Sequence, residues 1–432
     1  MLRSSLRVAR VPALSRSYAT ELTQASASGV KLASFTDPAP TSSISVLVKA
    51  GTRYETSPGL AAVLKSSVFK GTNKRSAIRL VRETEMYGGV LSASLTREHL
   101  VLTAEFLKGD EAYFAEVLGD AVTQAKFAKH EYNEEVIPQV ASEYEQAHAN
   151  PAVYALDIAH QLAFRHGLGN SLFASPHSAV DYVSAATYAQ SAFASPSNLS
   201  ILSTGVDAGA LSSLVSEFFV PSSSAAALSS PAASYFGGEL RAPAAGHSNS
   251  SLDHFLLAFQ GSSASEVDFE VLRYLLGGES SVKWSAGSSP LSKISSGSSS
   301  AQAFNFGYSD AGLFGMYITA PTAGVESIAQ AAVSALRTVA KGADAEAVKQ
   351  AVLKAKFAAA SASETRAGKL DLLASHITAS GSAPSLEELF AKFDKVTVES
   401  VTKAAEAALK SKPTTVAIGN MYQLPYADSL GL

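Results

Sequence analysis

The sequence predicts an α+β protein with two similar domains, each a largely antiparallel sheet with helices packed on one face. The chain has 432 residues, 47% of them hydrophobic, which is more than one ordinary core accommodates. Strand-like segments are followed by pairs of helical segments, and this order occurs twice. A stretch rich in Pro, Ser and Ala without charge, residues 221–235, lies between the two copies. We therefore expect domains at residues 19–220 and 236–432, joined by this linker.

The first copy opens with strands at residues 30–35 and 42–50, where short apolar runs end at Asp, Pro or Gly. Apolar residues then recur at helical spacing from position 60 to position 68, which predicts a short helix with one buried face. The remaining predicted elements are a helix at 77–86, two strands within 88–107, helices at 110–127 and 130–167 with breaks near Pro138 and Pro151, a strand at 197–205 and a helix at 207–219.

The second copy repeats this order. Its predicted elements are strands at 237–246 and 251–261, a helix at 266–277, a hairpin within 301–321, helices at 325–341, 344–360 and 384–410, and a closing strand at 414–420. The repetition indicates a duplicated domain.

Composition excludes several functions. The net charge is −4 and no basic run occurs beyond the N-terminus, so nucleic acid is not an expected partner. The chain has no cysteine, which excludes disulfides, thiolate nucleophiles, iron–sulfur clusters and cysteine-bound zinc. No run of 18 or more apolar residues occurs, so no membrane-spanning helix is expected. We predict no cofactor.

The N-terminus has the composition of a mitochondrial transit peptide, which we place at residues 1–18. Four arginines alternate with apolar residues and serines, and the first acidic residue is Glu21. Arg16 precedes Tyr18 by two positions, which predicts cleavage between Tyr18 and Ala19. The alternative, a basic tail on a cytosolic protein, leaves both the periodicity and the cleavage pattern unexplained.

Residues 50–72 carry the most specific pattern. They contain a Gly51-x-Arg53-x-Glu55 turn, a helix start at Gly59-Leu60-Ala61 and a closing Phe-Lys-Gly-Thr. This sequence pattern resembles that of the pitrilysin and mitochondrial processing peptidase family. Working members carry His-x-x-Glu-His in this helix, where two histidines on one face hold zinc and the glutamate polarises water.

The resemblance implies that the zinc chemistry has been lost here. Its frame places Ala62 and Ser66 at the histidine positions and Lys65 at the glutamate. Alanine offers no ligand atom, serine is a poor zinc ligand, and an ammonium repels a divalent cation. The third ligand of the family, a glutamate, aligns with Val140, and Glu143 lies one turn further on. We therefore predict neither a metal site nor a catalytic residue.

The second half of family enzymes holds the substrate with an arginine and a tyrosine. The corresponding tyrosine position is Phe304, which lacks the hydroxyl group, and Lys293 stands near the arginine position. Both halves of the composite site are therefore expected to be degraded. We also expect the uncovered faces of the two sheets to meet across a cleft filled by side chains or by another subunit.

Two non-catalytic roles agree with the resemblance. The first is a structural subunit of respiratory complex III on the matrix side of the mitochondrial inner membrane. Such a subunit would pair with a core protein 1 relative, contact cytochrome b and other subunits, and attach to the membrane through them. The alternative is the non-catalytic alpha subunit of the mitochondrial processing peptidase. The short glycine-rich stretch at 277–287 argues against the alternative.

Overall fold

The computed structural model describes residues 22–178, 180–219, 227–243, 252–278, 287–380 and 384–432. The first half contains a six-stranded sheet in the order β1-β2-β6-β3-β5-β4. Its strands are β1 (Leu22–Ala27), β2 (Val30–Phe35), β3 (Thr41–Val48), β4 (Val90–Leu95), β5 (Leu100–Leu107) and β6 (Leu199–Thr204). The pair β2–β6 is parallel, and the other neighbouring pairs are antiparallel.

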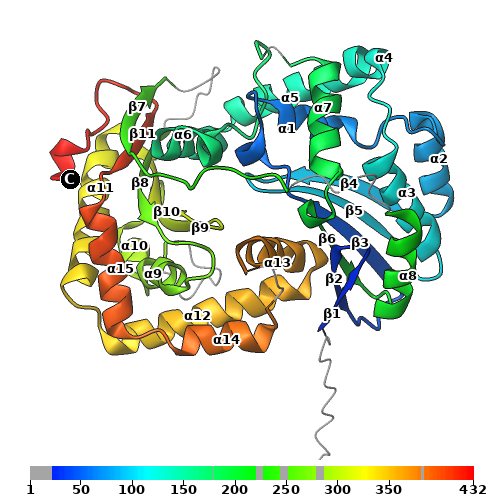
Figure 1. Ribbon diagram of the computed structural model, residues 1–432. Helices are drawn as coiled ribbons and strands as arrows, with labels where there is room; N and C mark the ends of the chain where they lie inside the picture. The colour runs from blue at the N-terminus through cyan, green and yellow to red at the C-terminus, as the bar shows by residue number, and fades with distance from the viewer. Residues whose placement is uncertain (1–21, 179, 220–226, 244–251, 279–286, 381–383) are drawn as a thin grey trace, which may run out of the picture.

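The second half contains a five-stranded sheet in the order β7-β11-β8-β10-β9. Its strands are β7 (Gly238–Ala242), β8 (Leu252–Gly261), β9 (Ser300–Gly307), β10 (Gly312–Pro321) and β11 (Thr414–Ile418). The pair β7–β11 is parallel and the others are antiparallel. This order repeats β2-β6-β3-β5-β4 strand for strand, with the parallel pair at the same place. The predicted pair of similar α+β domains is confirmed (Figure 1).

Strand β1 has no counterpart in the second sheet and was missed in the sequence. Its residues LTQASA carry little apolar pattern, because four of the six side chains are exposed at the edge of the sheet. The strand is held by a two-residue hairpin, in which Ala27 pairs with Val30. Ser28 and Gly29 both have positive φ angles, 51° and 79°, as the twist of such a hairpin requires.

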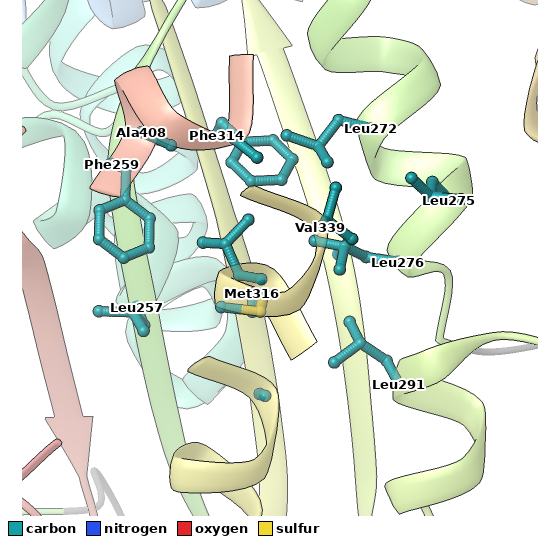
Figure 2. Packing of buried hydrophobic residues seen from close by; sticks show 14 of the residues in the cluster. Leu257, Phe259, Leu272, Leu275, Leu276, Leu291, Phe314, Met316, Val339 and Ala408 are labelled. Carbon is teal, nitrogen blue, oxygen red and sulfur yellow. The ribbon is translucent and has the colours of Figure 1, made fainter. Parts of the chain in front are cut away.

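Most helices cover the outer face of the sheet in their own half. In the first half, α1 (Leu60–Ser67), α3 (Glu111–Thr123), α7 (Tyr182–Phe193) and α8 (Ala208–Phe218) pack on the sheet, and α2 (Ala77–Met86) lies beside β4. In the second half the corresponding layer is α9 (Asp268–Leu276), α11 (Thr322–Lys341), α12 (Ala345–Glu364), α14 (Leu386–Asp394) and α15 (Val398–Lys410). Figure 2 shows part of this second core, where Phe314 of the sheet lies near Leu272 of α9 and Phe259 lies near Ala408 of α15.

The inner face of each sheet is covered by a helix from the other half. Helix α6 (Pro151–Phe164) packs Ile158 and Phe164 against Leu256 and Leu313 of the second sheet. Helix α13 (Arg366–Ser380) packs Leu370 and Leu373 with residues of the first sheet. Figure 1 shows α13 between the two halves. The expectation that bare sheet faces meet across a cleft therefore needs correction, because a helix of the other half lies on the inner face of each sheet.

Several helical boundaries differ from the sequence-based expectation. The predicted helix at 130–167 consists of α4 (Lys129–Glu131), the π-helical turn η2 (Tyr132–Val136), α5 (Ile137–Ala149) and α6. The breaks fall at the prolines, because Pro138 and Pro151 lack the N–H that an inner helical position needs and occupy first turns instead. The predicted helix at 384–410 is two helices, each begun by a capping box, at Ser385 and at Thr397.

Helices α7 and α13 were not predicted at all. The remaining short elements are η1 (Thr52–Tyr54), η3 (Gly167–Gly169), η4 (Pro196–Asn198), α10 (Pro290–Ile294) and η6 (Asp428–Leu430). Residues 227–237, which include the second part of the predicted linker, form no helix or strand. Within the described ranges, no helix has both the length and the apolar character to cross a membrane.

Candidate functional site

The Gly51-x-Arg53-x-Glu55 turn positions helix α1, which carries three of the predicted site positions. Gly59 precedes the helix with φ +95°, and a Cβ there would lie 2.7 Å from the Cβ of Ala174. The Glu55 carboxylate accepts hydrogen bonds from the N–H groups of Gly59 and Ala61, each at 3.2 Å, and so satisfies the start of the helix. Burial raises the pKa of Glu55 to about 7.

Two predicted zinc positions are brought together, on α1 and α5, inside one apolar cluster. Ala62 is 3% exposed and Val140 is 8% exposed. They pack with Val63, Tyr132, Val136, Ala174 and Ala185. Both positions that the family frame assigns to zinc ligands thus carry hydrocarbon side chains in one packed cluster.

The third predicted position, Lys65, forms an ion pair with Glu143. The Lys65 Nζ lies 2.5 Å from Oε2 of Glu143, and the two side chains are 18% and 30% exposed. Gln139 donates a hydrogen bond of 3.3 Å to the other carboxylate oxygen. Glu143, the predicted alternative acidic ligand, is thus neutralised by Lys65, which the family frame places at the glutamate position.

Ser66 is buried on α1, and its Oγ finds no hydrogen-bond partner among the described residues. Across the same ranges, no group of three or more His, Asp or Glu side chains is arranged to hold a metal ion. Through these positions, helices α1 and α5 are joined by apolar packing and by the ion pair of Lys65 with Glu143. They provide no ligand set that we can identify for zinc.

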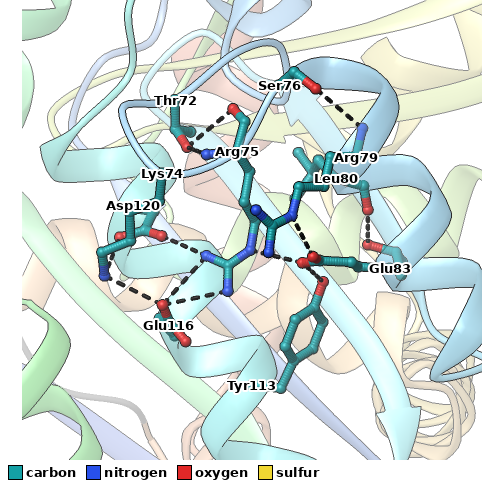
Figure 3. A network of polar contacts seen from close by, with 11 residues as sticks. Thr72, Lys74, Arg75, Ser76, Arg79, Leu80, Glu83, Tyr113, Glu116 and Asp120 are labelled. Atoms are coloured by element: carbon teal, nitrogen blue, oxygen red, sulfur yellow. Dashed lines mark hydrogen bonds and ion pairs between the residues drawn. The ribbon is translucent and has the colours of Figure 1, made fainter.

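The end of the motif is fixed by a second polar network. The guanidinium of Arg75 contacts Glu83 of α2 at 2.9 Å and Asp120 of α3 at 2.7 Å, and it also reaches Glu116. The Oγ1 of Thr72 accepts from the Arg75 N–H at 3.1 Å. Figure 3 shows that this arginine lies between the two helices. The network holds the closing Thr72 against α2 and α3.

A third network joins the two halves through the motif arginine. Arg53 lies 2.9 Å from Oε1 of Glu98 and 2.5 Å from Oδ2 of Asp310, which belongs to the second half. Glu98 in turn accepts from the N–H of Ser309 at 3.1 Å and from its hydroxyl at 2.5 Å. Arg53 and Glu98 are 5% and 4% exposed, so these charges are withdrawn from water. We call Arg53, Glu98, Ser309 and Asp310 the inter-half lock.

The sequence analysis identified Arg53 only as one residue of the Gly-x-Arg-x-Glu turn pattern and did not predict its ion pairs with Glu98 and Asp310. Glu98 lies between β4 and β5 within the run Thr96-Arg97-Glu98-His99. Four polar residues in a row at a predicted hairpin could have indicated a polar contact there. Asp310 stands in the matching hairpin between β9 and β10. The duplicated fold places these two hairpins against each other.

The second-half positions do not join the α1 cluster. Phe304 lies on β9 opposite Gly315, and its ring packs 5.5 Å from that of Phe306 in the core around α6. Lys293 is exposed on α10. The degraded residues of the two halves thus belong to separate surroundings.

The comparisons with known proteins agree with this description. Residues 31–175 match the family described as "Insulinase (Peptidase family M16)", and residues 187–354 match the "Peptidase M16 inactive domain". The chain belongs to peptidase family M16.

Within that family it is similar to proteins named "Cytochrome b-c1 complex subunit 2, mitochondrial". The relative from Cryptococcus neoformans var. grubii is 45% identical over 94% of both chains. The relative from Neurospora crassa is 37% identical over 94% of this chain and 90% of its own length. The human protein of that name is 26% identical over 93% of this chain and 90% of its own.

Proposed function

We propose that this protein is a structural, non-catalytic subunit of respiratory complex III, equivalent to core protein 2, on the matrix side of the mitochondrial inner membrane. The proposal is supported by near full-length similarity to relatives that carry the name of cytochrome b-c1 complex subunit 2. These relatives do not favour the alternative, the alpha subunit of the processing peptidase.

The observation that carries the non-catalytic role is the replacement of the zinc site. Ala62 and Val140 are packed in an apolar cluster, and Lys65 is paired with Glu143 at 2.5 Å. A zinc ion near α1 would meet the Lys65 ammonium, and within the described ranges no group of three or more His, Asp or Glu side chains is arranged to hold it. The helix that performs catalysis in the family serves here as a packing element.

A scaffold role agrees with the way the halves are joined. The exchanged helices α6 and α13 and the inter-half lock tie both sheets into one unit. In our proposal this unit pairs with a core protein 1 relative and contacts cytochrome b and other subunits, which attach it to the membrane. Residues 1–18 would act as the transit peptide and be removed between Tyr18 and Ala19.

Native electrophoresis of gently solubilised mitochondria tests the proposal. We expect the protein to migrate with cytochrome b in one large complex, and its depletion to remove assembled complex III. A soluble heterodimer that cleaves precursor proteins would instead establish the peptidase alternative. Zinc analysis of the purified chain adds an independent check, with no stoichiometric metal expected after dialysis.

A further inference from the structure

Two adjoining cavities lie where the halves meet. The larger measures about 580 Å³, a size that suits small organic molecules, and extends from the β4–β5 hairpin and α6 to β9 and α13. The smaller measures about 420 Å³ and continues between α9, α12 and α13. Asn305, Gly307 and Asp371 line both. We call this joined space the inter-half chamber.

The walls of the larger cavity are mainly apolar. Val153 and Leu156 of α6 face it, together with Phe173 and Phe306. Three histidines line the chamber, and burial keeps them neutral near pH 7, because it lowers the pKa of His99 to about 4 and lowers those of His160 and His376 as well. The chamber therefore favours a ligand with a substantial hydrocarbon part.

The cations of the lining are already paired. Arg97 contacts Asp157 at 2.8 Å, and Arg273 contacts Glu270 at 2.9 Å. Glu98 is paired with Arg53 of the inter-half lock. No free cation thus remains in the described lining to receive an anionic ligand.

Two carboxylates remain without a counter-charge. Asp371 and Glu266 line the chamber, both are also exposed to solvent, and neither has a salt bridge within the described ranges. Asp371 stands where the two cavities join, so its carboxylate can be reached from both. Partial burial raises the pKa of Asp371. A cationic group in the chamber would therefore pair with the Asp371 carboxylate, which stands beside the apolar walls.

We propose that the inter-half chamber binds a small lipophilic cation, an alkylammonium-type molecule whose positive group pairs with Asp371 while its hydrocarbon part lies against Val153, Leu156 and Phe173. A metal ion would not use the apolar walls, and an anion would face unpaired carboxylates. An extended peptide is a different ligand, and the experiment separates it from the proposed one.

Titration calorimetry on the full chain tests the proposal with three probes of equal length, decylamine, decanol and decanoate, below their aggregation concentrations. We expect saturable binding of one decylammonium per chain, about two- to fivefold tighter than decanol, because a solvated charge pair contributes about 0.2–1 kcal/mol. Decanoate should bind more weakly than decanol.

Asp371→Asn should abolish the preference for decylammonium over decanol, while Glu364→Gln, an exposed carboxylate outside the chamber, should leave it unchanged. Val153→Phe should weaken both probes by filling the apolar part. Equal affinity of the wild type for the amine and the alcohol would overturn the proposal, as would an undiminished preference in Asp371→Asn. Saturable binding of a basic peptide without binding of decylammonium would overturn it too.

Discussion

Replacement of Arg53 by methionine tests how strongly the inter-half lock joins the two halves. Methionine keeps the apolar stem and removes the guanidinium, which leaves Glu98 buried at 4% exposure without its cation. Breaking a buried pair costs about 3–5 kcal/mol. Glu98 keeps its hydrogen bonds from Ser309, so we expect the lower end, a loss of about 3 kcal/mol in the free energy of unfolding. The pair with Asp310, which is 32% exposed, adds less than about 1 kcal/mol.

Urea unfolding monitored by circular dichroism measures this loss as a shift of the first transition. Arg79→Met is the matched control, because Arg79 is 62% exposed and forms an i,i+4 pair with Glu83, so it should cost about 0.5 kcal/mol or less. The double variant Arg53→Met/Glu98→Gln should recover part of the loss, since no uncompensated charge remains. A loss below about 1 kcal/mol for Arg53→Met, or a double variant as unstable as the sum of the singles, would refute this account.

Four further outcomes are expected. Ala62→His alone should bind no zinc after dialysis, because the Lys65 ammonium still faces the site; tightly held metal measured by mass spectrometry would contradict this. N-terminal sequencing of the mitochondrial protein should give Ala19 as the first residue, and an intact Met1 would overturn the transit peptide. The pKa of Glu55 is raised to about 7 in the folded protein, above its value in the unfolded chain. Its contribution to the free energy of unfolding is therefore complete below about pH 4.5 and decreases as the pH rises to about 7. Glu55→Gln should flatten this part of the plot of stability against pH, and an unchanged plot would contradict the assignment. Leu373→Ala, in a side chain 4% exposed, should cost about 2–4 kcal/mol and speed amide exchange along α13, with exposed Leu353→Ala as a control that changes neither.

The sequence was sufficient for elements whose pattern is local. Alternating apolar runs indicated the strands from β2 onward, and their repetition indicated two similar sheets, which the shared strand order bears out. Strand β1 escaped because its side chains are polar and its position depends on a hairpin at Ser28 and Gly29. Helix α13 escaped because its sequence RAGKLDLLASHITAS lacks a strong apolar stripe.

The site could be predicted only in part for the same reason. The frame from Gly59 to Thr72 located Ala62, Lys65 and Ser66 on one helix, since spacing along a helix is fixed by its geometry. It could not show that Lys65 reaches Glu143, or that Arg53 reaches Asp310 across 257 positions of sequence. Contacts of that kind depend on how the two halves pack, and a single sequence does not encode this in any local pattern.

The exchange of α6 and α13 has a consequence for how the polypeptide acquires its structure after synthesis. In a chain that emerges with its N-terminus first, α6 appears about a hundred residues before the strands β8 and β10 that cover its apolar face. The inner face of the first sheet likewise remains uncovered until α13, which lies near the C-terminus of the chain, has been synthesised. Neither half can complete its fold alone. A fragment produced by cleavage within residues 227–237 should therefore expose apolar surface, tend to aggregate and depend on chaperones until the complementary fragment is added.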